Sequence, residues 1–461
     1  MGLILGSGST KPQYPYDMWY GVQGDFTSKD YKLTRIGNMD LHRTLPIQKK
    51  LRRFVENTDG SVKYYLHQND SRKKDSGAAA KLDTTDGNVM LEKPEYYARF
   101  EVEGTKWAMC ISEYALPGFV RMTRKTCAPW YSTIDIANNI VVSGCWLQWV
   151  GDEIKRDANG FVSLLASATN FRGGSGAGDA TKDGTYNSML GMPRTSISKT
   201  SVRPLCKNGT HIGVARVFTE IAWLQRIEYA SMHCQDTYNE TLTADGFHQG
   251  GLGNGTAVNG TAVNGTEWNT WGGYKPFIPC GVTAILGNNT GRVAYTIKGW
   301  TGGDKVVQVT SYRGLETPFE YLWLLADDVL IHCSPETADD PGHCTAYGCT
   351  DPTKFASPAD TSTAIPAGYE RITELPTAEG YQWNFGFSYD GFTFPTSIGG
   401  ASNQGLCDYF YRVAKATANG WYGALLSAGA NNGAYAGFGY LNATIRSSYS
   451  HAYSGFRLCR F

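Results

Sequence analysis

Glycine and aromatic residues, rather than long apolar helical runs, characterise this chain. Its 461 residues include 54 glycines and 28 tyrosines, and aromatic side chains make up 13% of the sequence. Glycine permits tight turns and loops, whereas tyrosine and phenylalanine are favoured in strands. The composition therefore predicts an α+β fold that is rich in strands and loops and poor in helices.

The length predicts more than one domain, because a single hydrophobic core rarely serves a chain of 461 residues. After Pro117-Gly118 the sequence changes from regular strand patterns to long glycine-rich connections. We therefore expect residues 1–118 to form a small β-rich N-terminal module that serves attachment. Residues 119–461 are expected to form a second, loop-rich domain.

The first part contains clear local patterns. In residues 46–56, Ile47, Leu51 and Phe54 share one helical face behind Pro46, which predicts a helix. Residues 60–66 follow an Asp-Gly turn and are typical of a strand, and residues 97–102 and 106–111 of a strand pair around a Glu-Gly turn. The polar residues 70–87 are expected to form a surface loop.

The second part has one strong helical pattern. Residues 216–235 place Ala222, Trp223 and Ile227 on one side of a helix. A tandem Asn-Gly-Thr-Ala-Val repeat at residues 254–266 is too short for a solenoid, so we expect an extended surface loop. Residues 334–372 are rich in turn residues and are expected to form a long excursion.

Charge and hydropathy argue against two classes of partner. Forty-two basic and 42 acidic residues give a formal net charge of zero, so no global field favours nucleic acid or an anionic membrane. No stretch of 18 apolar residues occurs, which predicts no membrane insertion. Residues 1–8 lack the charged segment and the long apolar run of a signal peptide, so we expect synthesis in the cytoplasm.

The eleven cysteines are scattered, and without an export signal we expect them to be free and mostly buried. One cluster allows an alternative, because His332-Cys333 and His343-Cys344 with Cys349 hold the ligand types of a zinc site. Their spacing is irregular, however, and no second Cys-x-x-Cys is present. We therefore expect no metal.

The segment between Gly420 and Cys459 has the composition of an adaptable binding surface. Small residues alternate with Tyr, Asn, Ser and His, and Arg446 is the only formal charge within residues 425–454. Tyrosine supplies large, rigid contact area, while Ser, Gly and Asn supply adjustable hydrogen bonds. The alternatives are a glycine-rich loop of an ordinary β-protein and, for each tyrosine, packing within a β-rich core.

Four segments, taken in order, resemble the formylglycine-generating-enzyme branch of the C-type lectin fold. Residues 219–230 are similar to its helix ending in a Trp-Glu-Tyr-Ala-type motif, and residues 312–323 to its Gly-Leu-x-Asp-Met-x-Gly-Asn-Val-Trp segment. Residues 425–429 stand in place of its Arg-Gly-Gly-Ser-Trp, and residues 455–457 match its closing Gly-Phe-Arg. The resemblance implies a C-type lectin-like ligand-binding domain over residues 119–461.

Three further segments resemble phage and prophage tail proteins from Bacteroides-type gut bacteria. They are residues 111–119, 243–253 and 274–281. In that family the C-terminal lectin-like domain is often the target of a diversity-generating retroelement, which mutates adenines in Asn codons. The resulting codons cannot encode Lys, Gln, Glu, Met or Trp, and residues 435–453 contain none of these five.

The resemblance implies a tail-fibre tip adhesin of the virion that attaches the phage to its host. Its partners would be a host surface protein or glycan and other tail-fibre proteins, and analogy with trimeric fibres implies a homotrimer. The variable, exposed, ligand-binding positions at about 420–455 would then be Tyr422, Asn431, Asn432, Tyr435, Phe438, Tyr440, Asn442, Thr444, Ile445, Arg446, Tyr449, His451 and Tyr453. The scaffold between them would include Trp421, Leu425 and Arg457.

The same fold also hosts an enzyme, which makes a formylglycine-generating-type oxidoreductase one alternative. Its known chemistry resides in cysteines after the Arg-Gly-Gly-Ser motif, yet residues 427–454 contain no cysteine. The eight histidines form no His-x-His or His-x3-His pattern, and the Glu-Pro-Asn, Gln-Pro-Asp and Trp-Asn-Asp triplets of calcium-dependent lectins are absent. We therefore expect no catalytic residue and no cofactor. A structural tail protein without receptor binding is the other alternative.

Overall fold

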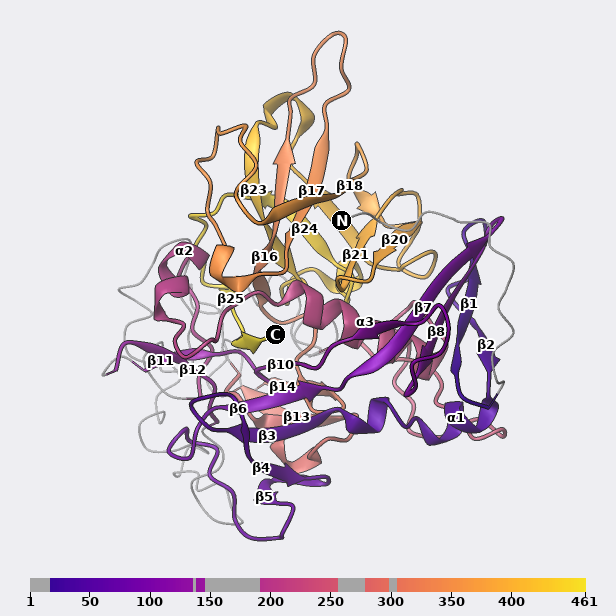
Figure 1. Ribbon diagram of the computed structural model, residues 1–461, viewed down its shortest axis with the longest axis vertical. Helices are drawn as coiled ribbons and strands as arrows, with labels where there is room; N and C mark the ends of the chain where they lie inside the picture. Colours follow the sequence, from indigo (N-terminus) through magenta and orange to yellow (C-terminus); the bar gives the residue numbers. More distant parts are fainter. Residues whose placement is uncertain (1–16, 136–137, 146–190, 256–277, 298–304) are drawn as a thin grey trace.

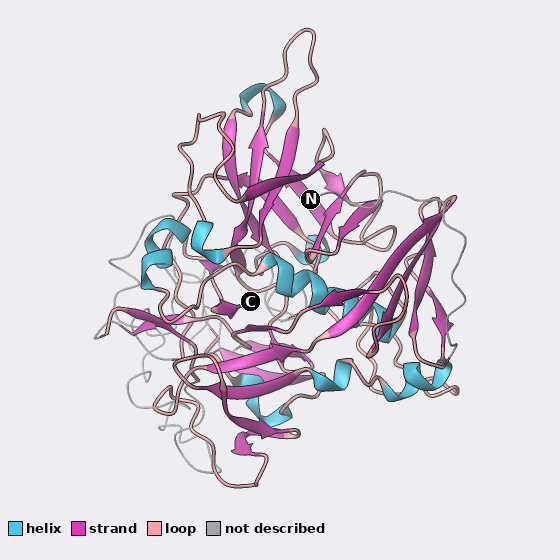
Figure 2. Ribbon diagram, in the orientation of Figure 1, coloured by secondary structure: helices cyan, strands magenta, loops and turns pink. Residues whose placement is uncertain are grey.

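The computed structural model describes residues 17–135, 138–145, 191–255, 278–297 and 305–461 (Figure 1). Strands predominate and helices are few and short (Figure 2), and one sheet curls into a half-barrel. The β-rich α+β composition predicted from the sequence is therefore confirmed. The tandem repeat beyond Gly255 lies outside the described residues. No helix in the described part is both long and apolar enough to span a bilayer.

The first sheet is antiparallel and has the strand order β2-β1-β8-β7-β9. Strands β7 and β8 form the predicted hairpin, and Gly104 in its turn adopts a φ of +60°, which glycine tolerates without strain. The bounds are β1 Tyr20–Asp25, β2 Thr34–Gly37, β7 Tyr96–Glu103, β8 Lys106–Ser112 and β9 Val120–Met122.

The second sheet joins the two ends of the sequence. Its order is β26-β10-β6-β3-β4-β5, so the C-terminal strand β26 pairs with β10, which in turn pairs with β6. Strand β4 is the strand predicted at residues 60–66. The bounds are β3 Arg52–Glu56, β4 Val62–His67, β5 Asp70–Lys74, β6 Val89–Lys93, β10 Lys125–Cys127 and β26 Cys459–Arg460.

The largest sheet occupies the top of Figure 1 and has the order β18-β17-β16-β23-β24-β22-β19, with β25 pairing β16. Its bounds are β16 Trp323–Cys333, β17 Cys344–Cys349, β18 Tyr369–Glu374, β19 Gly380–Tyr381, β22 Tyr409–Arg412, β23 Gly420–Leu426, β24 Leu441–Ile445 and β25 Ser454–Gly455. Smaller sheets hold β11 Thr133–Asp135 with β12 Ile140–Val142, β13 Gly291–Ile297 with β14 Lys305–Tyr312 and β15 Leu315–Glu316, and β20 Phe385–Ser388 with β21 Phe392–Pro395.

Helix α3, Ala215–Tyr229, is the helix predicted at residues 216–235. It begins where both carboxylate oxygens of Asp328 on β16 accept hydrogen bonds from the first backbone N–H groups, at 3.1 Å each. It ends earlier than predicted because Ala230 adopts the left-handed conformation, with a φ of +49°. The other helices are α1 Met39–Thr44, α2 Lys199–Val202 and the 3-10 turns η1 Gln48–Lys50, η4 Arg203–Leu205, η6 Val282–Leu286, η7 Pro352–Lys354, η8 Lys415–Thr417 and η9 Gly433–Tyr435.

Three predictions of local structure are wrong. The helix predicted at residues 46–56 is replaced by η1 and β3, because β3 pairs with both β4 and β6 and buries its residues on both faces. The loop predicted at residues 70–87 contains β5, and the excursion predicted at residues 334–372 contains β17 and part of β18. In each case strand pairing overrides the local pattern, including the short-range pairing of β5 with its neighbour β4.

The expectation of free cysteines is wrong at one pair. Cys333 and Cys344 face each other across β16 and β17, their Cα atoms are 4.1 Å apart, and they form a disulfide. The nine other cysteines are free, and all of them except Cys206 are buried. Within the described ranges, no three His, Cys, Asp or Glu side chains lie together as metal ligands would.

Packing is continuous across the boundary predicted at residue 118. Strand β9 follows that boundary yet pairs with β7, and β10 pairs with β6. Trp107 of the N-terminal hairpin also contacts Trp223 of α3 and Phe385 of β20, at ring-centroid distances of 5.8 and 5.1 Å. The two parts therefore share one hydrophobic cluster.

Because of this shared core, we expect a fragment that begins at residue 119 not to fold alone. Removing residues 17–118 would strip β10 of its β6 partner and expose the buried ring of Trp223. Circular dichroism of the expressed fragment and limited proteolysis of the full chain measure this. A protease-resistant fragment starting near residue 119 would show instead that the boundary separates two independent units.

Candidate binding surface

The most extended aromatic feature of the described surface lies at one end of the large sheet. Nine rings form a continuous chain of contacts, and all of them except Tyr440 are partly exposed. We term this feature the aromatic row, and in spatial order it contains Tyr381, Tyr409, Tyr435, Tyr411, Tyr440, Trp323, Tyr453, His451 and Tyr449.

Strand pairing explains why these rings meet. Trp323 is the first residue of β16, and its neighbour Leu324 pairs with Leu426 at the end of β23. Leu426 pairs with the first residue of β24, which pairs in turn with β22, and Tyr409 of β22 faces Tyr381 of β19. The ends of five strands therefore lie in one line, and the row follows that line.

Neighbouring rings of the row are in close contact. Tyr409 lies 5.2 Å from Tyr381 and 4.4 Å from Tyr435, measured between ring centroids. On the other side, Tyr453 lies 4.9 Å from Trp323 and 3.5 Å from His451. Such pairs stabilise one another beyond their buried area, so the rings form a pre-ordered surface.

Hydrogen bonds fix the loops that carry the row. The side-chain oxygen of Asn432 accepts bonds from the indole nitrogen of Trp323 at 2.8 Å and from the backbone N–H of Gly429 at 2.9 Å. The backbone N–H of Trp323 donates to the carbonyl of Tyr453 at 2.8 Å. The loop before η9 and the loop before β25 are therefore both held on the start of β16.

A polar cavity of about 320 Å³ lies beside η9. Gln235 donates from its side-chain amide to the carboxyl of Glu320 at 3.2 Å and to the carbonyl of Gly433 at 3.1 Å, which anchors η9 from below. Burial raises the pKa of Glu320 well above its usual value. His233 and Ser402 also line the cavity.

The tyrosine hydroxyls of the aromatic row are uncharged hydrogen-bonding groups. Burial raises the pKa of Tyr411 to about 12, and burial followed by the hydrogen bond with Tyr453 raises the pKa of Tyr449 further. Both hydroxyls are therefore protonated at neutral pH and can donate as well as accept. The row contains no Asp, Glu, Lys or Arg. Its rings can bind a partner through apolar faces and neutral hydrogen bonds.

The structure brings part of the predicted site together. Tyr435, Tyr449, His451 and Tyr453 lie in the row and are partly exposed, and Asn432 holds it. Asn431 and Thr444 are exposed, and Arg446 is partly exposed. The binding role of these residues stays a prediction.

Five predicted positions are not exposed, which corrects the expectation from the sequence. They are Tyr422, Phe438, Tyr440, Asn442 and Ile445, with exposed fractions of 5% or less. Four of them lie in or beside β23 and β24, the inner strands between β16 and β22, where most side chains are covered on both faces. Phe438 instead packs in the core against Phe319, at 5.6 Å between ring centroids.

The side chain of Arg446 is held by contacts within the protein and is not free to contact a partner. Its guanidinium lies 3.8 Å from the ring centroid of Tyr422 and donates to the carbonyl of Trp421 at 2.8 Å. The predicted scaffold residues Trp421, Leu425 and Arg457 are buried.

Sequence reasoning missed four members of the row, namely Trp323, Tyr381, Tyr409 and Tyr411. They precede the glycine-rich segment and reach the surface only through sheet pairing. One local signal was present, because Tyr409-Phe410-Tyr411-Arg412 alternates partly exposed and buried positions with the period of a strand. That alternation places both tyrosines on one face.

The described geometry thus provides a rigid, uncharged aromatic surface on the end of a β-sheet. Comparison of the chain with protein-family models, with curated proteins and with solved structures finds no match.

Proposed function

We propose that this protein is a phage tail-fibre tip adhesin that binds a host cell-surface receptor through the aromatic row. The observation that carries the proposal is the row itself, in which eight partly exposed rings from separate segments are joined into one chain of contacts through the buried ring of Tyr440. Tyrosine and tryptophan dominate the energetics of binding surfaces because they bury large area at low entropic cost.

On this proposal the row combines fixed and variable rings. Trp323, Tyr381, Tyr409 and Tyr411 lie upstream of the segment that the tail-protein resemblance marks as diversified. Tyr435, Tyr449, His451 and Tyr453 lie within it. The upstream rings would supply affinity common to all variants, while the downstream rings would set which receptor is recognised.

We also propose that residues 119–461 adopt a C-type lectin-like fold of the formylglycine-generating-enzyme type. The four segments that carry the resemblance contact one another in support of this. Glu228 of the first forms a bidentate ion pair with Arg313 of the second, at 2.6 and 2.7 Å. Arg457 of the last donates to the carbonyl of Glu316 in the second at 2.7 Å, and Tyr321 of the second pairs with Gly429 of the third.

Competition for adsorption tests the adhesin proposal. Purified full-length protein is added in excess to cells of a host strain before virions that carry it, and free virions are counted. We expect the protein to occupy the receptor and to reduce adsorption in a saturable manner. Undiminished adsorption, together with no binding of labelled protein to the cells, would favour the structural tail protein instead.

A further inference from the structure

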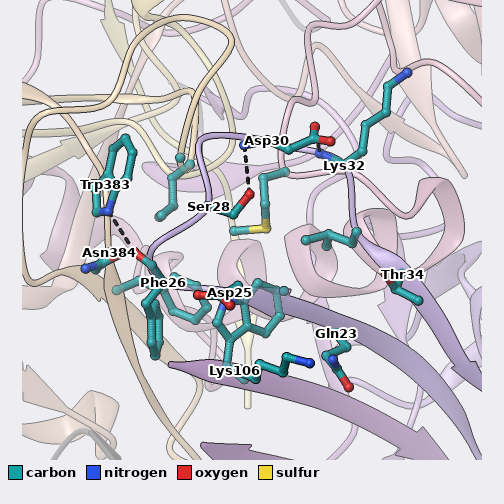
Figure 3. Close-up of a pocket in the computed structure, with 17 residues that line it drawn as sticks. Gln23, Asp25, Phe26, Ser28, Asp30, Lys32, Thr34, Lys106, Trp383 and Asn384 are labelled. Carbon is teal, nitrogen blue, oxygen red and sulfur yellow. Dashed lines mark hydrogen bonds between the residues drawn. The ribbon is translucent and has the colours of Figure 1, made fainter. Parts of the chain in front are cut away.

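A second cavity has a volume of about 330 Å³, and Figure 3 shows it in close-up. It is bounded by the turn between β1 and β2, the start of β8 and the segment around residues 383–406. No member of the aromatic row lines it. Its volume falls at the lower end of the range for small-molecule sites, so it suits a ligand of one ring rather than a chain.

The floor of this cavity is aromatic. Phe385 lies 5.1 Å from Trp107 and 5.5 Å from Phe26, measured between ring centroids. A Cβ at Gly24 would lie 2.4 Å from the indole of Trp107, so this ring packs directly against the glycine backbone. Trp107 and Phe385 are only 4% and 3% exposed. The aromatic lining residues that remain partly exposed are Phe26 and Trp383, which rest on this packed floor.

The walls are held in place by hydrogen bonds within the protein. The carboxylate of Asp25 accepts from the backbone N–H of Thr27 at 2.8 Å, from its hydroxyl at 2.7 Å and from the hydroxyl of Thr105 at 3.1 Å. The indole N–H of Trp383 donates to the carbonyl of Phe26 at 2.8 Å, one of the dashed lines in Figure 3. The cavity is therefore preformed, which lowers the entropic penalty of binding.

The rim of the cavity carries equal numbers of acidic and basic side chains. Asp25 and Asp30 supply carboxylate oxygens, while Lys32 and Lys106 supply ammonium groups, so the formal charges of the lining residues cancel. The hydrogen bonds from Thr27 lower the pKa of Asp25 and keep it ionised. Neither lysine forms an ion pair with another residue of the described ranges, and Gln23 and Asn384 add amides.

We infer that this cavity binds a single neutral sugar unit, with its apolar face against the partly exposed rings of Phe26 and Trp383 and its hydroxyls at the rim. A hydroxyl both donates and accepts, so it can satisfy a carboxylate and an ammonium group side by side. A ligand with a single net charge would instead be attracted by either the two carboxylates or the two ammonium groups and repelled by the other pair. This site is independent of the aromatic row, and it neither requires nor excludes the adhesin function.

Calorimetric titration of the full-length protein with glucose, galactose, mannose and N-acetylglucosamine tests the inference. We expect saturable binding of at least one of these sugars. The double variant Lys106→Ala with Asn384→Ala should bind it at least about tenfold more weakly, because it removes a charged donor and an amide. Lys29→Ala, an exposed lysine in the same turn that does not line the cavity, should bind like the unaltered protein.

Neither substitution removes a side-chain hydrogen bond that the fold uses. Lys106 is exposed, and the side-chain oxygen of Asn384 has no hydrogen-bond partner. Thermal melts monitored by circular dichroism should therefore be unchanged. The inference is overturned if none of the four sugars binds, if only glucuronate or inorganic phosphate binds, or if the double variant binds as tightly as the unaltered protein. If the double variant unfolds, the single variant Lys106→Ala is titrated in its place. Binding as tight as that of the unaltered protein then overturns the inference.

Discussion

Replacing Glu220 with alanine is expected to lower the free energy of unfolding by roughly 3–5 kcal/mol. Glu220 lies in α3 and is fully buried, and its carboxylate is 2.5 Å from the ammonium of Lys93 and 2.7 Å from that of Lys125. The variant would leave two buried positive charges without their counter-ion. Urea denaturation of the unaltered protein and the variant measures the difference.

The loss of unfolding free energy in Glu220→Ala is expected to depend on pH. Burial lowers the pKa of Lys93 to about 8, below the value of about 10.4 that a lysine has in an unfolded chain. Between these two values the unfolded state binds more protons than the folded state, so this group makes the protein more stable as pH rises. Glu220 raises the pKa of Lys93, so without it Lys93 loses its proton at lower pH still. The deficit of the variant should therefore shrink between pH 7 and pH 9.

An exposed ion pair serves as the matched control. Glu95 lies 2.6 Å from Arg121, and both side chains are well exposed to water. Glu95→Ala should leave the denaturation midpoint almost unchanged, because solvent screens such pairs. Equal losses in Glu95→Ala and Glu220→Ala, or a deficit that does not depend on pH, would show that the buried triad does not stabilise the packing of α3 on β6 and β10.

Local patterns predicted the elements whose contacts lie close in sequence. The β7–β8 hairpin needs only neighbouring residues and a glycine at the turn, and it was predicted correctly. The segment at residues 46–56 has helical spacing, but its neighbours β6 and β4 offer pairing on both sides, so it forms β3. Strand β26 is two residues long, and no local signal marks it; it exists because β10 provides an edge for it.

Only part of the candidate surface could be predicted from the sequence. The clustering of tyrosine with asparagine and serine identified the segment that supplies Tyr435, Tyr449 and Tyr453 to the row. Composition cannot tell which tyrosine of that segment faces outward, since this depends on register within β23 and β24 and on burial against the core. Tyr440 is therefore covered although its sequence neighbourhood resembles that of Tyr435.

Partly exposed tyrosines of the row are expected to contribute to binding and not to folding. The double variant Tyr409→Ala with Tyr435→Ala is expected to abolish binding to host cells while leaving folding stability nearly unchanged. Both rings are partly exposed and lie 4.4 Å apart between centroids, and each also contacts Tyr381 and Tyr411, so they supply much of the contact area in this half of the row. Their truncation removes surface rather than core, and the expected stability change is within about 1 kcal/mol.

Tyr440→Ala should behave in the opposite way. Its ring is fully buried between Tyr411 and Trp323, so truncation leaves a cavity and is expected to lower the free energy of unfolding by roughly 3–5 kcal/mol. Tyr114→Ala, at a tyrosine that is 54% exposed and outside the row, should alter neither binding nor stability.

Thermal melts and flow cytometry with labelled protein separate these outcomes. Loss of binding in the Tyr409 and Tyr435 variant with an unchanged melting temperature assigns the row to receptor contact. A large drop in its melting temperature would instead make these rings part of the structural framework. Unchanged binding in a well-folded variant would move the contact surface away from the row. The Tyr→Phe versions of both substitutions then distinguish ring stacking, which they keep, from hydroxyl hydrogen bonds, which they remove.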